Sequence, residues 1–238
     1  MLGIPVVVLA LLAAPAEEMT TYYVVSLRPN PARTALAKEE GEKMQAAHMA
    51  HILSMARRGK LVAAGPFGDT PTTISGIFVF ETPTLAEARS EAEADPTVVA
   101  KRNLVEILTW QAPKGIGAEY RRLHAADPKT PEGMGVHPLA YLRKGDGWDA
   151  AARAEHEGYL VQLRAQGKLA AAGPAESEDG MVSLVVFDRI AYEEAERLMA
   201  EDPAVKSGAL KPEFHHWWCS AHVLPWAATP KAEAATAR

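Results

Sequence analysis

The sequence predicts an α+β protein built from two copies of one β-α-β-β-α-β unit. The first observation is a repeat: residues 48–66 read HMAHILSMARRGKLVAAGP and residues 156–174 read HEGYLVQLRAQGKLAAAGP, identical at eight of 19 positions. Ordinary composition would give roughly one or two identities. The second observation is that strand and helix patterns follow in the same order around both copies. The 238 residues therefore divide into two tandem domains of about 100 residues each.

The composition excludes several classes of partner. Hydrophobic residues make up 48% and charged residues 23%, as in soluble globular proteins. The net charge is -5 and basic residues are interspersed with acidic ones, so no positive stripe is available for nucleic acid. The single Cys219 excludes an internal disulfide framework. No stretch approaches the roughly 20 apolar residues of a membrane span, so we expect no membrane partner after processing.

The first 16 residues predict a secretory signal peptide. An apolar run from Ile4 to Leu12 is followed by Ala14-Pro15-Ala16, a small-x-small cleavage pattern. We therefore expect a periplasmic or secreted protein that begins at Glu17. The segment contains no Lys or Arg, so a mis-assigned start or a disordered leader is the alternative. The Ala-rich residues 227–238 are expected to form a disordered tail.

The first domain is predicted to span residues 19–112. β-Branched and aromatic residues predict the strands, and Met44, His48 and Ile52 recur at helical spacing in a long helix that Gly59 ends. A residue before proline leaves the helical region, so the second helix should stop at Asp95. The predicted strands are 20–27, 61–64, 74–81 and 105–110, and the predicted helices are 35–58 and 84–94.

A linker and a second domain complete the predicted organisation. Residues 113–134 are rich in Pro and Gly, with at most a short helix at 118–126. The second domain, residues 135–226, repeats the order of the first. From its third strand onward the displacement is 107 instead of 108, so one residue is missing from the loop after Gly-Pro. Its predicted strands include 136–142, 169–172 and 181–188, and its helices are 148–166 and 191–200.

Each copy places a histidine, His48 or His156, on the apolar stripe of its first helix. A lone histidine there is most often a core residue bonded to one carbonyl. However, both copies also keep an aspartate, Asp95 or Asp202, 47 or 46 residues later. A carboxylate beside an imidazole fixes its tautomer and raises its basicity, which a general base requires. The competing explanation is that each Asp-Pro only terminates a helix.

These residues resemble the YCII-related (YciI-like) domain of the dimeric α+β barrel superfamily. The resemblance rests on the helix histidine, Gly-Lys-Leu eleven residues later, Ala-Gly-Pro, Glu-Ala and Asp-Pro, and it covers about residues 20–110 and 136–217. It implies two ferredoxin-like domains that pack against each other within one chain as an intramolecular dimeric α+β barrel. The chain would then be an internal pseudo-dimer and a monomer in solution. It also implies catalytic residues, which are His48 with Asp95 and His156 with Asp202.

The resemblance leaves the reaction open, because the wider superfamily includes muconolactone isomerases and small monooxygenases. Most such domains are single and intracellular, whereas this chain is doubled and carries a predicted signal peptide. In an antiparallel helix pair Asp95 would lie near the start of the first helix, whereas His48 stands about ten residues before Gly59, about 15 Å from that helix terminus, so only an irregular or late-starting helix would bring the pair close. We predict that each His-Asp pair meets, directly or through one water, and that both histidines line a cleft beside the barrel.

Four further positions are candidates for substrate binding. His51 and Tyr159 stand one turn after the histidines, and they either hold a substrate oxygen or place a polar tip in water. Gly65 and Gly173 of the repeated Gly-Pro are the other two. His48 and His51 together are spaced for a metal, but Tyr159 breaks the pattern in the second copy.

A separate cluster near the end of the chain contains potential metal ligands. Strand alternation places the first two on opposite faces, and no recognised ligand spacing is met. We therefore expect a polar strand edge, with no metal and no cofactor. The residues are His215, His216, Cys219 and His222.

Two functions follow as hypotheses. The first is a small-molecule enzyme that uses the His-Asp pair as general acid/base in isomerisation, elimination or lyase chemistry on a small organic acid or ring compound. The alternative is a non-catalytic exported module that binds a ligand or assembles. They differ in whether each histidine reaches a water-accessible pocket or is sealed by side chains.

Overall fold

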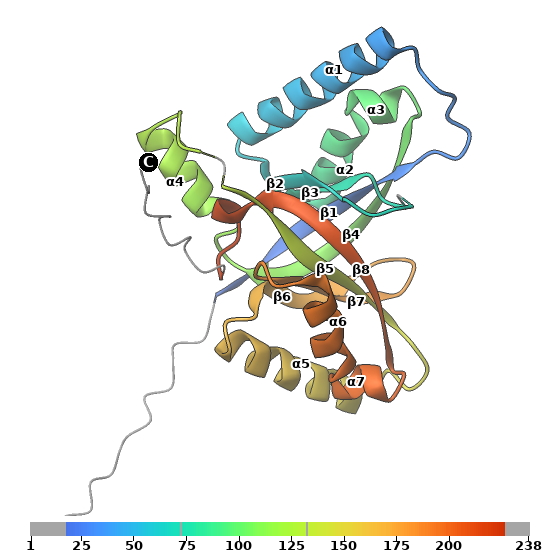
Figure 1. The fold of residues 1–238 in the computed structure, drawn as a ribbon, viewed down its shortest axis with the longest axis vertical. Coiled ribbons are helices and arrows are strands. Elements are labelled where there is room, and N and C mark those ends of the chain that lie inside the picture. The colour runs from blue at the N-terminus through green and yellow to red at the C-terminus, as the bar shows by residue number, and fades with distance from the viewer. Residues whose placement is uncertain (1–17, 72, 132, 227–238) are drawn as a thin grey trace, which may run out of the picture.

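The computed structural model describes residues 18–71, 73–131 and 133–226, so the predicted signal peptide and the predicted tail lie outside the described residues. Each repeat contains the predicted β-α-β-β-α-β order with one short additional helix (Figure 1). The first comprises β1 (Met19–Pro29), α1 (Lys38–Arg57), β2 (Leu61–Pro66), β3 (Gly76–Phe80), α2 (Leu85–Glu93), α3 (Pro96–Val99) and β4 (Asn103–Pro113). The second comprises β5 (Met134–Lys144), α5 (Ala150–Ala165), β6 (Leu169–Glu176), β7 (Met181–Phe187), α6 (Tyr192–Ala200), α7 (Pro203–Lys206) and β8 (Leu210–Ser220).

The two short helices, α3 and α7, begin at the Asp-Pro pairs where the second helix of each repeat was expected to stop. Asp95 and Asp202 are the N-cap residues, and each accepts a hydrogen bond from the backbone N–H two residues later. The proline then occupies the first helical position, where its missing N–H costs nothing. Each Asp-Pro pair therefore ends one helix and starts the next.

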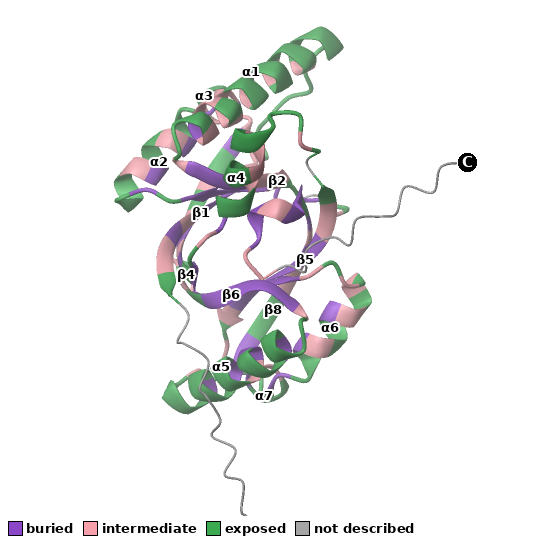
Figure 2. Cartoon of the chain, turned by 90° about the vertical axis from the view of Figure 1, so that its left-hand side faces the viewer, coloured by how far each residue is buried: buried purple, intermediate pink, exposed green. Residues whose placement is uncertain are grey.

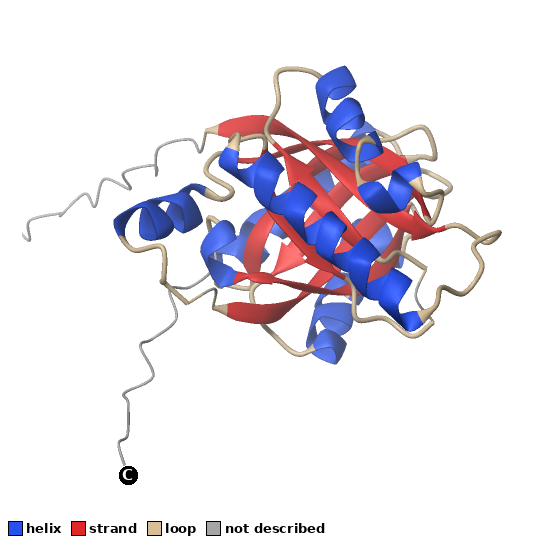
Figure 3. Cartoon of the chain, turned by 90° about the horizontal axis from the view of Figure 1, so that it is seen from above, coloured by secondary structure: helices blue, strands red, loops and turns tan. Residues whose placement is uncertain are grey.

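The eight strands form one antiparallel sheet in the order β2-β3-β1-β4-β6-β7-β5-β8. Its two edge strands meet: a bridge joins Phe67 to Trp217, and the N–H of Gly68 donates to the carbonyl of His216 at 2.9 Å. On the other side β4 pairs with β6 through Trp110 and Ala175. The sheet is thus curled into a barrel with helices on its outer surface (Figure 3).

The interior of the barrel is a single apolar core shared by the two repeats. It includes Tyr22 and Trp110 from the first repeat and Leu139 and Trp217 from the second, all buried. In Figure 2 buried strands surround this interior while the outer helices are largely exposed. A smaller apolar cluster lies between the sheet and the helices of each repeat. The predicted intramolecular α+β barrel is confirmed.

The connection between the repeats contains α4 (Ala118–Ala126), at the predicted position. The 3₁₀ helix η1 (Ala221–Val223) follows β8 and packs beside α4, and the N–H of Gly117 donates to the carbonyl of Val223 at 2.8 Å. Among the described residues, no helix has the length and apolar character needed to cross a bilayer.

Candidate active site

In the first repeat the predicted pair, His48 and Asp95, is in direct contact. Nδ1 of His48 lies 2.7 Å from Oδ2 of Asp95. The other carboxylate oxygen accepts the backbone N–H and the hydroxyl of Thr97, at 2.9 and 2.6 Å. Burial alone would raise the pKa of the Asp95 carboxyl, but the hydrogen bonds from His48 and Thr97 outweigh it and hold this pKa below its ordinary value. The aspartate therefore faces the imidazole as a carboxylate.

The pair meets because the two helices differ in length. Helix α1 has 20 residues and α2 has nine, which correspond to about 30 and about 14 Å. The end of α2 therefore reaches only the middle of α1, where His48 is the eleventh residue. The expectation that Asp95 would lie near the start of α1 was wrong for this reason.

The second repeat makes the same contact, but both ring nitrogens of its histidine have protein partners. Nδ1 of His156 lies 2.6 Å from Oδ2 of Asp202, and Nε2 lies 3.0 Å from the hydroxyl of Ser183. That hydroxyl also donates to the carbonyl of Gly173 at 3.2 Å. Trp148 covers the imidazole edge to face, with ring centroids 6.2 Å apart. Protein groups thus engage both ring nitrogens of His156.

Exposure separates the two histidines. The His48 side chain is 16% exposed and the His156 side chain is 3% exposed. Gly76 stands in β3 where Ser183 stands in β7, since each pairs with the proline of its Gly-Pro sequence. Among the described residues no hydrogen-bond partner is found for Nε2 of His48. The first repeat therefore has an imidazole with one free nitrogen.

His48 lies in a cleft of about 840 Å³, which we call the first cleft. It lies between α1 and strands β2 and β3, with α4 and η1 at one end. The ring of His48 stacks on Phe78, with centroids 5.9 Å apart. Most of the lining is apolar, and Met49 and Leu53 of α1 are 44 and 51% exposed. The volume falls in the range of small-molecule sites.

The second cleft, of about 760 Å³, lies at the matching place in the second repeat. Its lining includes His156 and Ser183, and it carries charges of both signs, among them Arg153, Arg164 and Glu157. Both histidines thus line a cleft as predicted. Of the two, His48 alone has a ring nitrogen that finds no partner among the described residues.

His51 and Tyr159 make matching contacts with protein. Nε2 of His51 lies 2.9 Å from the carbonyl oxygen of Glu91, and the Tyr159 hydroxyl donates to the carbonyl of Leu198 at 2.6 Å. These carbonyls belong to the last turn of α2 and of α6. Each polar tip therefore ties the first helix of its repeat to the second. Substrate binding by these two residues stays a prediction.

Gly65 and Gly173 lie where the two repeats join. A Cβ atom on Gly65 would stand 1.8 Å from the carbonyl oxygen of Trp218, and one on Gly173 would stand 2.0 Å from that of Gln111. Each glycine also lines the cleft of its own repeat. Close approach between strands of different repeats therefore requires glycine here, whatever a ligand requires.

Comparisons with known proteins bear on the same residues. The sequence profile of the YCII-related domain matches residues 21–111 and 139–212, more than half of the chain. The chain belongs to this family. None of the curated proteins compared with it matches its sequence. The matched segments contain both His-Asp pairs.

Solved structures show the fold of this YCII-related protein in other chains. A variant of the chlorite dismutase from Candidatus Nitrospira defluvii superposes with a TM-score of 0.54 at 11% identity, covering 84% of this chain and 92% of that one. A protein described as a candidate chlorite dismutase gives 0.52 at 12% identity, covering 86% and 97%. A heme-binding protein from Thermus thermophilus gives 0.47 at 13% identity, covering 87% and 96%. At 11 and 12% identity, the likeness to the first two structures concerns the fold alone.

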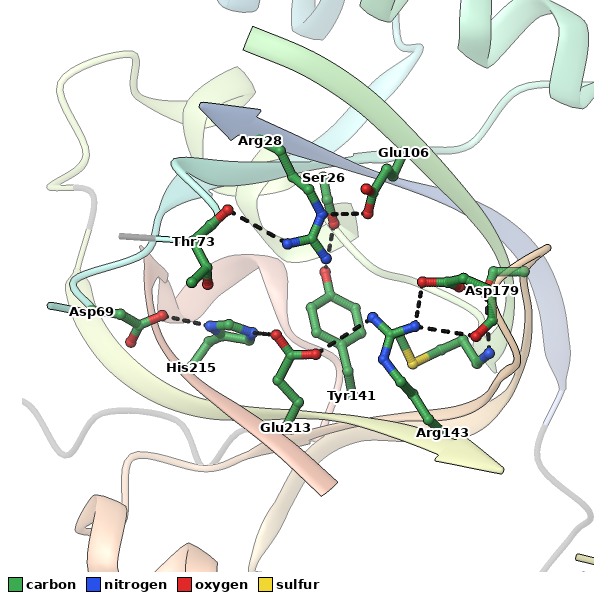
Figure 4. A network of polar contacts seen from close by, with 12 residues as sticks. Ser26, Arg28, Asp69, Thr73, Glu106, Tyr141, Arg143, Asp179, Glu213 and His215 are labelled. Carbon is green, nitrogen blue, oxygen red and sulfur yellow. Dashed lines mark hydrogen bonds and ion pairs between the residues drawn. The ribbon is translucent and has the colours of Figure 1, made fainter. Parts of the chain in front are cut away.

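The histidine cluster of β8 has protein partners. Nδ1 of His215 lies 2.5 Å from Asp69, which also accepts the backbone N–H of His216 at 2.9 Å. Figure 4 shows His215 between Asp69 and Glu213 at one end of the barrel interior. Cys219 is fully buried, and burial raises the pKa of its thiol. No group of three potential metal ligands occurs among residues 18–71, 73–131 and 133–226.

The same end of the barrel holds matching ion pairs from the two repeats (Figure 4). Arg28 pairs with Glu106, and Arg143 with Glu213 and Asp179. Ser26 and Tyr141 bond to each other across the interior at 3.0 Å, and burial raises the pKa of the tyrosine. These charges satisfy one another, so this end of the barrel is a structural closure.

Two contributors were missed at the sequence level. Ser183 reads as an ordinary strand residue until it is aligned with Gly76, 107 residues earlier, and only their difference shows that one site is closed. Thr97 follows Asp95-Pro96 and gives no pattern of its own, although its hydroxyl donates to the catalytic candidate Asp95. Aligning the repeats could have revealed Ser183, whereas the sequence contained no signal for Thr97.

Proposed function

We propose that this YCII-related protein is a small-molecule enzyme whose working site is the His48–Asp95 pair of the first repeat. The observation that carries the proposal is the 2.7 Å contact between Nδ1 of His48 and Asp95, with the opposite ring nitrogen left for an 840 Å³ cleft. A carboxylate on Nδ1 keeps the lone pair on Nε2, as general-base catalysis requires.

The reaction we propose is a proton transfer within a small organic acid or ring compound. Nε2 of His48 removes a proton from a carbon of the substrate, and Asp95 stabilises the imidazolium that forms. Returning the proton to another carbon completes an isomerisation, whereas loss of a leaving group completes an elimination. Positioned general bases contribute about 10²- to 10⁴-fold to such rates.

The second repeat supports the alternative function for its own cleft. His156 is engaged on both sides by Asp202 and Ser183 and is almost fully buried. The order Ser-His-Asp is that of a nucleophilic triad, but the Ser183 hydroxyl is buried and donates to Gly173. We propose that this half supports the barrel or binds a ligand without chemistry.

Chemical modification tests the difference between the two histidines. Diethyl pyrocarbonate acylates accessible, uncharged imidazole nitrogens, so His48 should be modified much faster than His156, as followed by peptide mass spectrometry. Equal rates would remove the reason for placing the base in the first repeat.

A second experiment tests the reaction class. The protein is incubated in D₂O with a panel of small carbonyl acids and lactones, and exchange of carbon-bound protons is followed by NMR. The wild type should catalyse exchange in at least one compound, His48→Gln should lose it, and His156→Gln should keep it. Binding of panel members without exchange would favour the alternative, a binding protein.

A further inference from the structure

We propose that the first cleft binds an apolar molecule carrying one anionic group, and that Arg33 and Arg102 receive that group. The inference rests on the proposed function in one respect: it names the class of substrate for the His48 site. The chain as a whole has a net charge of -5. None of the described residues that line the first cleft is Asp or Glu, whereas three are arginines: Arg33, Arg102 and Arg121.

The two arginines come from segments of the cleft lining that are in contact. A guanidinium N–H of Arg102 donates to the carbonyl of Thr34, the neighbour of Arg33, at 3.0 Å. Arg121 lies 3.9 Å from Glu81, so its charge is partly balanced. Among the described residues no ion-pair partner is found for Arg33 or Arg102. This part of the lining therefore offers two uncompensated cations, which attract a carboxylate, sulfonate or phosphate.

This cationic part of the lining is joined to the histidine site through the backbone. The N–H of Arg102 donates to the carbonyl of Thr97 at 2.8 Å, and Thr97 in turn bonds Asp95. The amide of Asn103, the next residue, donates to the Thr97 hydroxyl at 3.0 Å. An anionic group held there is thereby placed in a fixed relation to His48.

Arg33 lies in a connection between strand and helix that is longer in the first repeat, 30–37, than in the second, 145–149. Ser26 and Tyr141 occupy matching strand positions, opposite Glu106 and Glu213, and they are 115 residues apart. The two helix histidines are 108 apart. The first repeat therefore has seven more residues between strand and histidine, in the segment that brings Arg33 and Leu36 to the cleft.

The rest of the first cleft suits an apolar body. The side chains along α1 that line it include Met44, Met49, Ile52 and Leu53, and Phe78 lies on the opposite wall. Exposed apolar surface of this kind is stabilised when a ligand covers it. The second cleft has acidic as well as basic lining residues, so the same argument does not apply there.

Two dyes of nearly the same shape test the proposal: 8-anilinonaphthalene-1-sulfonate, which is anionic, and N-phenyl-1-naphthylamine, which is uncharged. Dissociation constants are measured by fluorescence titration of the full chain. The double variant Arg33→Gln with Arg102→Gln should raise the dissociation constant of the anionic dye at least tenfold. It should change the dissociation constant of the uncharged dye less than twofold. The matched control, Arg153→Gln with Arg164→Gln in the second cleft, should leave both dyes within twofold.

Several outcomes would overturn the proposal. The proposal is wrong if the anionic dye binds the double variant as tightly as the wild type. It is also wrong if the double variant binds both dyes equally more weakly, or if the control pair weakens binding of the anionic dye as much as the double variant does. If circular dichroism shows that the Gln double variant is misfolded, Arg33→Lys with Arg102→Lys is used in its place. Raising the salt concentration from about 0.05 to about 0.5 M should then weaken binding of the anionic dye only. Selective loss of the anionic dye in a protein that exchanges no carbon-bound proton would contradict the catalytic proposal alone, so the two proposals can fail separately.

Discussion

At the scale of single residues, Asp95 has two partners that can be separated by mutation. Its carboxylate holds His48 and also caps α3. Asparagine caps a helix about as well as aspartate. Asp95→Asn should therefore cost only about 1 kcal/mol of stability. It should nevertheless lower any His48-dependent rate at least about 10²-fold, because the carboxylate no longer fixes the imidazole.

The measurement combines denaturant unfolding with the deuterium-exchange assay. Asp95→Ala should lose the cap as well, at about 1 kcal/mol further. Asp202→Asn is the matched control, and it should cost similar stability while leaving exchange unchanged. If Asp95→Asn retained full exchange, Asp95 would be a helix cap and nothing more.

Ser183 provides a second test at this scale. Replacing Ser183 with glycine gives the second repeat the residue that the first has at the matching position, Gly76, and frees Nε2 of His156. Ser183→Gly should increase the rate at which diethyl pyrocarbonate modifies His156, at a cost of about 1–2 kcal/mol of stability for the lost hydrogen bonds and added chain freedom. An unchanged rate would show that Trp148, and not Ser183, closes the second site.

At the scale of elements, Glu91 fixes the end of α2 to α1 and β2. It accepts two hydrogen bonds from Arg58 and one from Lys60. These cations lower the pKa of Glu91 to about 2, from an ordinary value of 4.5. A depressed carboxyl pKa stabilises the folded state above the unfolded value, and this stabilisation disappears as the pH falls from about 4.5 to about 2.

Glu91→Gln should therefore flatten the loss of stability between these two pH values. The effect at neutral pH should be on the order of 1 kcal/mol, since solvent screens the exposed Arg58. Urea unfolding at a series of pH values measures it. The second repeat has Leu198 at this place, so Leu198→Ala, which removes no charge, serves as the control. Parallel pH profiles for wild type and Glu91→Gln would contradict the prediction.

Gly65 and Gly173, the two glycines where the repeats join, can be tested at the same scale. Gly65→Ala and Gly173→Ala each place a Cβ atom within 2.0 Å of a backbone carbonyl of the other repeat, so neighbouring strands must move apart. Each should cost about 3 kcal/mol or more, as overpacking against backbone does. Gly158→Ala in α5 meets nothing within 4 Å and should stabilise by about 0.5–1 kcal/mol. Mild effects at both seams would mean that the strands separate easily.

The elements also show what could be predicted from sequence. Strand and helix order followed from periodicity and from stops such as Gly59, and α4 was placed correctly because Pro and Gly flank it. That His48 and Asp95 meet was predicted, but whether they meet directly or through one water was left open. That depends on how far a nine-residue helix reaches along a 20-residue one, and on α3, whose four residues carry no periodic signal.

At the scale of the whole molecule, duplication produced two unequal sites in one barrel. A repeat detected in sequence predicts two equivalent sites, because it weighs identities and ignores single differences. Two differences separate the sites here: Ser183 in place of Gly76, and seven extra residues between the first strand and the helix histidine of the first repeat. Both repeats have a cleft, but among the described residues only the first leaves a ring nitrogen of its helix histidine without a protein partner.

The shared interior leads to the last prediction, which concerns cooperativity and assembly. Tyr22, Trp110, Leu139 and Trp217 belong to one core, so neither repeat can lose its sheet without exposing the other. Both edges of the sheet are also joined within the chain, which leaves no free edge strand among the described residues for a second copy. We therefore expect a monomer of about 25.6 kDa by sedimentation, and one unfolding transition in urea that is the same by tryptophan fluorescence and by circular dichroism. Two separated transitions would show that the repeats fold on independent cores, and a stable dimer would show that the barrel is not closed within one chain.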